Sequence, residues 1–217
     1  MVMIGILMAL QVNNWNEERA IQKEFKVSFQ KLLTDLESDA AVLELLDSVY
    51  LAQAAIGENI QNLLGANNSL SDIDQIRSFP RMSNTSMTYS NSTYRSLVNT
   101  GLLYKLKDQE LANMIDSYYI NMEEQARITQ NMGDSNRNIR DSEVLFPFQY
   151  ILRTTDNVFK ANANALQWMN DDQSEIFQAA QYYLRIYVRQ NFQKSNMVKQ
   201  SLENNNKLRQ TLSDMDL

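Results

Sequence analysis

Between Trp15 and Leu64 the apolar residues recur mostly at spacings of three or four, with charged and amide residues between them. This heptad-like spacing places the apolar side chains along one stripe of an α-helix. The pattern predicts one long amphipathic helix that stops at Gly65, because glycine favours the conformation that follows a helix end. The predicted core positions are Phe25, Phe29, Leu32, Leu36, Ala40, Leu43, Leu46, Tyr50, Ile56, Ile60, Leu63 and Leu64.

Two further stripes of the same period predict two more long helices. Asp108 is placed to cap the first of them, and Asp172 and Glu175 have the spacing of a capping box for the second. The second half of that last helix, from Ser195, is more polar, so we expect it to fray or to pair with a second copy of the chain. The stripes are formed by Leu111, Ile115, Tyr118 and Met122, and by Ile176, Ala180, Leu184, Val188, Val198, Leu202, Leu208 and Leu212.

Shorter helices are predicted over residues 92–100, ended by Gly101, and over residues 156–170. The chain of 217 residues contains only five Gly and two Pro, which favours long uninterrupted helices over strands and turns. The predicted fold class is therefore all-α, an elongated antiparallel helical bundle that continues from an N-terminal membrane helix.

The first twelve residues break the alternating pattern, because ten of them are apolar and none is charged. The run turns polar at Asn13, carries Trp15 at the boundary and reaches charge at Glu17, which is typical of a helix leaving a membrane. We therefore divide the chain into residues 1–14, the distal half of a membrane anchor helix, and residues 15–217, a soluble helical bundle. The anchor residues are Ile4, Ile6, Leu7, Leu10 and Trp15.

This apolar run is too short to span a bilayer, which takes roughly 20 mostly apolar residues. It also lacks the basic start and the small-residue cleavage site of a signal peptide. The sequence then either begins inside a longer, here truncated, membrane helix or carries an apolar arm. Such an arm would dock on a partner, on a membrane surface or on its own bundle. A simpler interpretation is that Ile4, Leu7, Met8 and Leu10 begin a buried core helix.

Residues 4–17, which read IGILMALQVNNWNE, resemble the signature of a small, uncharacterised family of bacterial membrane proteins, approximately IGILIALQINNWNE. The resemblance continues more weakly through residues 94–102 and 111–119. It implies a single N-terminal membrane helix, preceded by a short basic segment and followed by a helical soluble region of about this length. The basic segment and the first half of that helix have no counterpart in this sequence. The family has no established activity, so the resemblance implies a fold and a location but no reaction.

The amino-acid composition excludes several kinds of catalytic and metal-binding site. The absence of Cys and His excludes disulfides and thiolate metal sites, and it removes the commonest general base. There is no phosphate-binding glycine loop, and a net charge of −6 without a dense basic cluster argues against a nucleic-acid partner. We expect no catalysis, no cofactor and no metal. Asp35, Glu37 and Asp39 alternate along one predicted helix, and we expect them to form a solvated face.

Tyrosines gather in the middle third of the chain. Tyrosine combines an apolar ring with a polar tip, which suits small-ligand pockets and interfaces. Tyr94, Arg95, Tyr118 and Tyr119 are therefore a candidate ligand or interface set. The alternative is that the tyrosines are residues at the rim of the bundle core.

Together these patterns predict a single-pass inner-membrane protein whose bundle is an interaction or scaffolding module for a protein partner or a second copy. The alternative is a small-ligand sensor that passes a displacement along residues 15–64 to a membrane signalling partner. The basic residues after the apolar run, from Arg19 to Lys31, would place the bundle in the cytoplasm. The basic segment implied by the resemblance reverses that orientation, and we expect a periplasmic bundle in the cell envelope.

Overall fold

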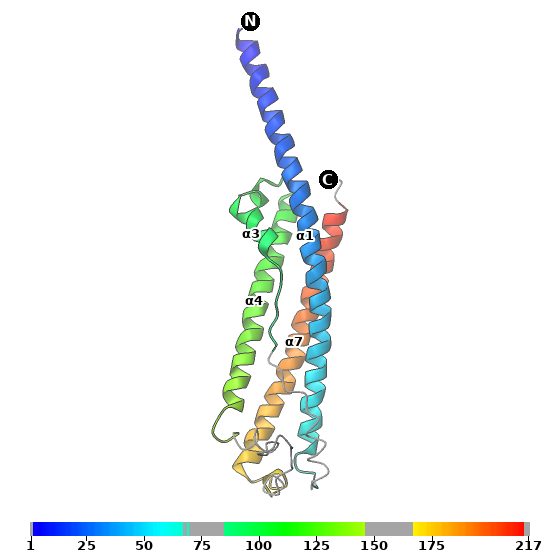
Figure 1. The fold of residues 1–217 in the computed structure, drawn as a ribbon, viewed down its shortest axis with the longest axis vertical. Helices are drawn as coiled ribbons and strands as arrows, with labels where there is room; N and C mark the ends of the chain where they lie inside the picture. The colour runs from blue at the N-terminus through cyan, green and yellow to red at the C-terminus, as the bar shows by residue number, and fades with distance from the viewer. Residues whose placement is uncertain (1, 67–68, 70–84, 146–166, 215–217) are drawn as a thin grey trace, which may run out of the picture. The chain divides into compact units, whose positions relative to one another are not determined.

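The computed structural model describes residues 2–66, 69, 85–145 and 167–214, and these residues form helices and no strand. The all-α prediction is confirmed. The helix predicted over 156–170 lies largely outside the described residues. The elements are α1 (Val2–Leu63), α3 (Ser92–Asn99), the 3₁₀ helix η1 (Leu103–Lys105), α4 (Gln109–Arg140) and α7 (Glu175–Ser213), shown in Figure 1.

Helix α1 is one continuous helix of 62 residues. Every position of its predicted stripe is buried or half-buried, and Phe29 and Leu36 are fully buried. Each large apolar side chain in such a stripe contributes about 1.5–3 kcal/mol when it leaves water, so the stripe holds α1 against the rest of the bundle. The helix ends at Leu63, within two residues of the predicted stop at Gly65. Gly65 follows with a φ of +85°, and its N–H donates to the carbonyl of Met169 at 3.1 Å.

The predicted C-terminal end of α3 and the predicted start of α4 are also confirmed. Gly101 follows α3 with a φ of +69°, a conformation that residues with a Cβ rarely adopt. At the start of α4, the N–H of Leu111 donates to a carboxylate oxygen of Asp108 at 2.9 Å. This cap satisfies one of the N–H groups that have no partner inside the helix.

The capping box predicted for α7 is wrong by two residues. The N–H of Phe177 donates to the hydroxyl of Ser174 at 3.1 Å, so Ser174 is the cap. Asp172 accepts a hydrogen bond from the side chain of Gln173 instead, at 2.9 Å. The physical reason is a turn, closed by the N–H of Ser174 and the carbonyl of Asp171 at 3.0 Å, which keeps Asp172 out of the helix.

The polar second half of α7 stays helical to Ser213, so the expected fraying is wrong. Asn205 is fully buried, and its amide donates to the carbonyl of Leu36 at 3.0 Å and to the hydroxyl of Tyr118 at 2.9 Å. A buried amide with these partners avoids much of the desolvation penalty that would otherwise fray the helix. Pairing with a second copy stays a prediction.

Contacts divide the chain into two compact units, and the division at residue 14 stays a prediction. Unit 1 comprises Met1–Leu43, Thr88–Glu123 and Ser201–Leu217. Unit 2 comprises Glu44–Met87 and Glu124–Gln200. Each unit contains a part of α1, a part of α4 and a part of α7.

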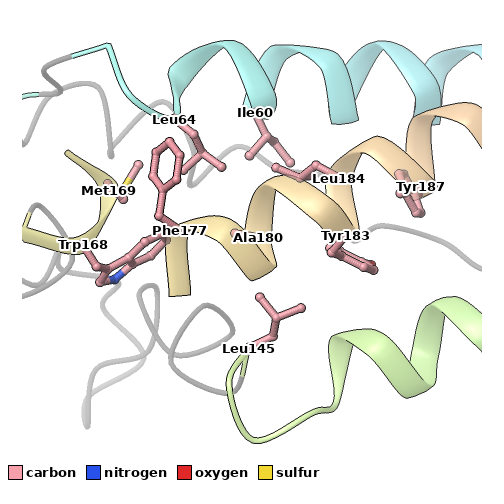
Figure 2. Close-up of a cluster of buried hydrophobic side chains, with 10 residues drawn as sticks. All are labelled: Ile60, Leu64, Leu145, Trp168, Met169, Phe177, Ala180, Tyr183, Leu184 and Tyr187. Atoms are coloured by element: carbon pink, nitrogen blue, oxygen red, sulfur yellow. The ribbon is translucent and has the colours of Figure 1, made fainter. Parts of the chain in front are cut away.

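In unit 2, α7 packs antiparallel to α1, as predicted. The ammonium of Lys199 lies 3.8 Å from the carboxylate of Asp47, whereas a Cβ on Gly65 would lie 3.3 Å from the ring of Phe177. Residue numbers therefore fall along α7 as they rise along α1. The apolar core of this unit, drawn in Figure 2, consists of Ile60, Leu64, Leu145, Trp168, Met169, Phe177, Ala180, Tyr183, Leu184 and Tyr187.

In unit 1, α4 runs in the same direction as α1. The N–H of Ser90 donates to Asp39 at 2.7 Å, and the ammonium of Lys107 lies 3.5 Å from the carboxylate of Glu18. Between these two contacts the chain returns along α1 toward its start. Helix α4 begins directly afterwards, and its Tyr118 shares the amide of Asn205 with the carbonyl of Leu36. Residue numbers therefore rise along α4 and α1 together, so α4 runs parallel to α1, and α7 supplies the antiparallel partner.

Candidate functional site

The first turns of α1 are uncovered (Figure 1). Every described side chain from Met3 to Ala20 is exposed, and the large apolar ones are 55–78% exposed. At about 100° per residue these side chains point to all sides of the helix. A helix that is apolar on all sides belongs in a protein core or in a membrane. Because these side chains are exposed, the alternative that they begin a buried core helix is wrong. The uncovered apolar side chains are Met3, Ile4, Ile6, Leu7, Met8, Leu10, Val12 and Trp15.

Polar and charged residues lie between this apolar segment and the buried stripe of the bundle. The guanidinium of Arg19 lies over the ring of Trp15, 4.9 Å from its centroid, and the amide of Asn13 donates to Glu17 at 3.0 Å. The buried stripe begins with Phe25, ten residues or about 15 Å beyond Trp15. Among the described residues, α1 is the one helix that is long and apolar enough to cross a membrane.

The tyrosines of the candidate ligand set meet in unit 1. The rings of Tyr94 and Tyr119 stack with centroids 4.3 Å apart, and Tyr118 meets Tyr119 edge-on at 5.0 Å. The hydroxyl of Tyr94 donates to Asp116 at 2.6 Å. Arg95 is exposed and lies outside this stack. Because Tyr118 and Tyr119 are buried, the stack is a packed layer of the core, and its role in ligand or partner binding stays a prediction.

The acidic face predicted on α1 is only partly solvated. Glu37 is exposed and Asp35 is half-buried, but Asp39 is 2% exposed, so the prediction is wrong for Asp39. One oxygen of Asp39 accepts the hydrogen bond from Ser90. The other oxygen, one oxygen of Asp35 and the hydroxyl of Tyr119 are buried without a hydrogen-bond partner in the described part of the chain. Unit 1 therefore holds buried acidic oxygens that no cation neutralises within the described residues.

The protonation of Asp39 should be visible in stability. Burial raises the pKa of this carboxyl and the charge of Asp35 raises it further, while the hydrogen bond from Ser90 opposes both. A raised pKa in the folded state means that stability is lost as the pH rises above the ordinary value of 3.8. We expect Asp39→Asn to raise the free energy of unfolding by about 1 kcal/mol near pH 8, with little gain near pH 4, measured by urea unfolding.

Glu37→Gln provides the matched control, since it makes the same change two residues away on the exposed side of α1. It should leave the free energy of unfolding within about 0.5 kcal/mol of the unsubstituted chain at both pH values. A loss of stability in Asp39→Asn near pH 8 would mean that the charged carboxylate is needed in the fold.

Unit 2 contains a buried cation. Lys194 is 1% exposed, and its ammonium lies 5.5 Å from the ring centroid of Tyr50 and 3.4 Å from the carbonyl oxygen of Thr85. The hydroxyl of Tyr50 donates to the same carbonyl at 3.1 Å. Desolvation lowers the pKa of Lys194 to about 8. Lys194 and Tyr50 thus join α7 and α1 to the segment that contains Thr85.

Sequence reasoning missed these buried polar residues, although a signal was present. Asp39, Lys194 and Asn205 each fall on the period of an apolar stripe, three or four residues from buried neighbours such as Leu36, Val198 and Leu208. A polar residue at such a position either reaches water or is buried with a partner, and it is the first place to look for a polar core.

The fold and the uncovered segment define an all-α protein whose long first helix has the length and composition to cross a membrane. The profile of a family of unknown function, DUF6090, matches residues 1–143, and the chain belongs to this family. The match spans α1, α3, η1 and α4, and it confirms the resemblance to an uncharacterised family. Searches among curated proteins and among solved structures found no match.

Proposed function

We propose that this protein is a membrane-anchored helical bundle without catalytic activity, which serves as an interaction or scaffolding module of the bacterial cell envelope. The observation that carries the proposal is the apolar segment of α1, whose eight large apolar side chains are uncovered on all sides of the helix. Its direct partner would be the membrane. The bundle would engage a protein partner or a second copy, and not a nucleic acid.

The physical argument is the cost of leaving this segment in water. Burying each of its large apolar side chains is worth about 1.5–3 kcal/mol, and the bundle buries none of them. Trp15 and Arg19 follow at the position where aromatic and basic side chains meet lipid headgroups. From Val2 to Val12 the helix rises about 15 Å, roughly half of the 30 Å hydrocarbon core.

Orientation is the finer part of the proposal. The resemblance described above implies a basic segment ahead of the membrane helix, and the side of a membrane protein that carries more Lys and Arg stays in the cytoplasm. The bundle would then lie on the periplasmic side of the inner membrane. The opposite side is favoured by the basic residues after the apolar run, Arg19, Lys23, Lys26 and Lys31, and thiol labelling decides between the two orientations.

The chain lacks Cys, so a single introduced thiol reports location. Ser69→Cys is suited because Ser69 is exposed, whereas Ser195 is buried and its hydroxyl donates to Asp47. Intact cells are treated with a maleimide that passes the outer but not the inner membrane, and the membrane fraction is isolated afterwards. We expect Ser69→Cys to be found in this fraction and to carry the label. The unsubstituted chain gives the background.

Labelling only after lysis would place the bundle in the cytoplasm and overturn the orientation. Recovery of the chain in the soluble fraction would overturn the anchor itself.

The sensor is a second candidate, favoured by the buried polar atoms of unit 1. One oxygen of Asp35, one of Asp39 and the hydroxyl of Tyr119 lack a partner within the described chain, and both aspartates lie on the helix that carries the anchor. A small polar ligand that pairs with these atoms would raise the melting temperature by mass action. A ligand screen by thermal shift, with no shift in Tyr119→Phe, separates the sensor from the interaction module.

A further inference from the structure

Three residues beyond Trp15, unit 1 presents a second element beside α1. Residues 102–107 form the η1 segment, which consists of η1 and its flanking residues. The ammonium of Lys107 lies 3.5 Å from the carboxylate of Glu18, which brings the end of the η1 segment level with residue 18 of α1. Along the helix axis, Glu18 lies about 5 Å beyond Trp15. The polar headgroup layer of one leaflet is about 5–8 Å thick. If Trp15 lies where this layer meets the hydrocarbon core, the end of the η1 segment lies about 5 Å further out, within the headgroup layer.

The η1 segment is held in place by burial on its inner side. Leu102, Leu103 and Leu106 are each less than 8% exposed, so the short helix and its flanking residues are packed onto the bundle by three apolar side chains. Its outer side carries Tyr104, which is 63% exposed, followed by the exposed Lys105. A large aromatic side chain is therefore fixed in an outward position on a segment that is otherwise well packed.

These residue types suit a lipid headgroup layer. Tyrosine is enriched where a membrane protein meets the interface, because its ring is apolar and its hydroxyl is polar. Lys105 and Lys107 can donate to lipid phosphates. The acidic neighbours Glu17 and Glu18 on α1 keep this surface from being strongly basic, which fits headgroups that carry both a phosphate and an ammonium group.

We propose that the η1 segment, with Tyr104, Lys105 and Lys107, docks on the lipid headgroups of the membrane that holds α1. The proposal rests on the membrane anchor proposed above and goes beyond it. The bundle has a second contact with the membrane besides the helix that leaves it. Two contacts fix the tilt of unit 1 against the membrane, whereas a single helix would leave it free to lean.

Fluorescence quenching in vesicles tests both proposals separately. The full chain, which has no Cys of its own, is given one thiol at Leu10, Tyr104 or Tyr182, labelled with bimane and reconstituted into phosphatidylcholine vesicles. Tyr182→Cys is the matched control, because Tyr182 is 57% exposed on α7 in unit 2. Lipids brominated on the acyl chain report insertion at Leu10, and lipids with a nitroxide on the headgroup report contact at Tyr104.

We expect acyl-chain quenching at Leu10→Cys, and headgroup quenching several-fold stronger at Tyr104→Cys than at Tyr182→Cys. Insertion at Leu10 with equal headgroup quenching at Tyr104 and Tyr182 would overturn the docking surface and leave the anchor standing. In that case the exposed Tyr104 would face a protein partner. Absence of acyl-chain quenching at Leu10 would overturn the anchor, and the docking proposal with it.

Discussion

Replacing Ile4 and Leu7 together by aspartate is expected to release the protein from the membrane. With Trp15 at headgroup level, Leu7 lies about 12 Å and Ile4 about 16 Å deeper, close to the bilayer centre. Aspartate at that depth costs about 2.5–3.5 kcal/mol per residue, and its short side chain cannot reach the interface. Two such changes weaken insertion by about 6 kcal/mol, or roughly 10⁴-fold. The measurement is the fraction of the chain that stays in the membrane pellet after an alkaline wash.

The same pair of changes further along α1 provides the control. Leu45 and Leu51 are exposed leucines of the same helix, in its bundle part. Leu45→Asp with Leu51→Asp should stay in the membrane pellet, because neither residue lies in the apolar segment. Because Ile4 and Leu7 are 61% and 58% exposed, their replacement should also leave the melting temperature of the bundle unchanged. Retention of the Ile4 and Leu7 double variant in the pellet would show that another part of the chain holds the protein to the membrane.

The helices could be predicted because the signals that define them are local. The stripe from Phe25 to Leu64 follows from the period of apolar residues alone, and the Asp108 cap and the glycine ends follow from residue types that favour those positions. The start of α7 was missed for a local reason too. Asp172 and Ser174 are both suitable caps two residues apart, and only the turn that Asp171 makes with Ser174 decides between them.

The positions of the polar core residues carried a signal, but their partners could not be predicted, because these lie far away along the chain. The carboxyl of Asp39 is paired with Ser90, 51 residues away, and the amide of Asn205 with Leu36, 169 residues away. Periodicity puts such a residue on a stripe but does not say what faces it. The direction of α4 depended in the same way on the path of the chain between α1 and α4, which no pattern of apolar residues records.

Removing the charge of Lys194 is expected to have the second large effect. Burial without a carboxylate partner among the described residues holds the pKa of this ammonium at about 8, against an ordinary value of 10.5. At neutral pH the folded chain therefore bears an unfavourable charge, with an upper limit of about 3 kcal/mol. We expect Lys194→Met to raise the free energy of unfolding by about 1–3 kcal/mol near pH 7, because methionine retains most of the side-chain volume. The carbonyl of Thr85 keeps its hydrogen bond from Tyr50.

The pH profile separates this charge effect from a packing effect. Between the folded pKa of about 8 and the ordinary 10.5, the unfolded chain binds the proton that the folded chain has lost. Stability of the unsubstituted chain therefore rises as the pH rises above 8, and Lys194→Met should lack this rise. The rise in the free energy of unfolding should be measured below about pH 10. Above that pH tyrosines ionise in the unfolded chain, whereas burial raises the pKa of Tyr50 to about 12 in the folded chain, so stability falls.

The measurement is urea unfolding in detergent, followed by tryptophan fluorescence. In a Trp15→Phe background the signal comes from Trp168, which lies in unit 2 together with Lys194. Lys199→Met is the matched control: the same substitution five residues along α7, at a side chain that is 52% exposed beside Asp47. It should change the free energy of unfolding by less than about 0.5 kcal/mol and keep the rise with pH. If Lys194→Met were instead destabilised at every pH, the ammonium would contribute more through Tyr50 and Thr85 than its burial costs, and Lys194 would be a stabilising part of the unit 2 core.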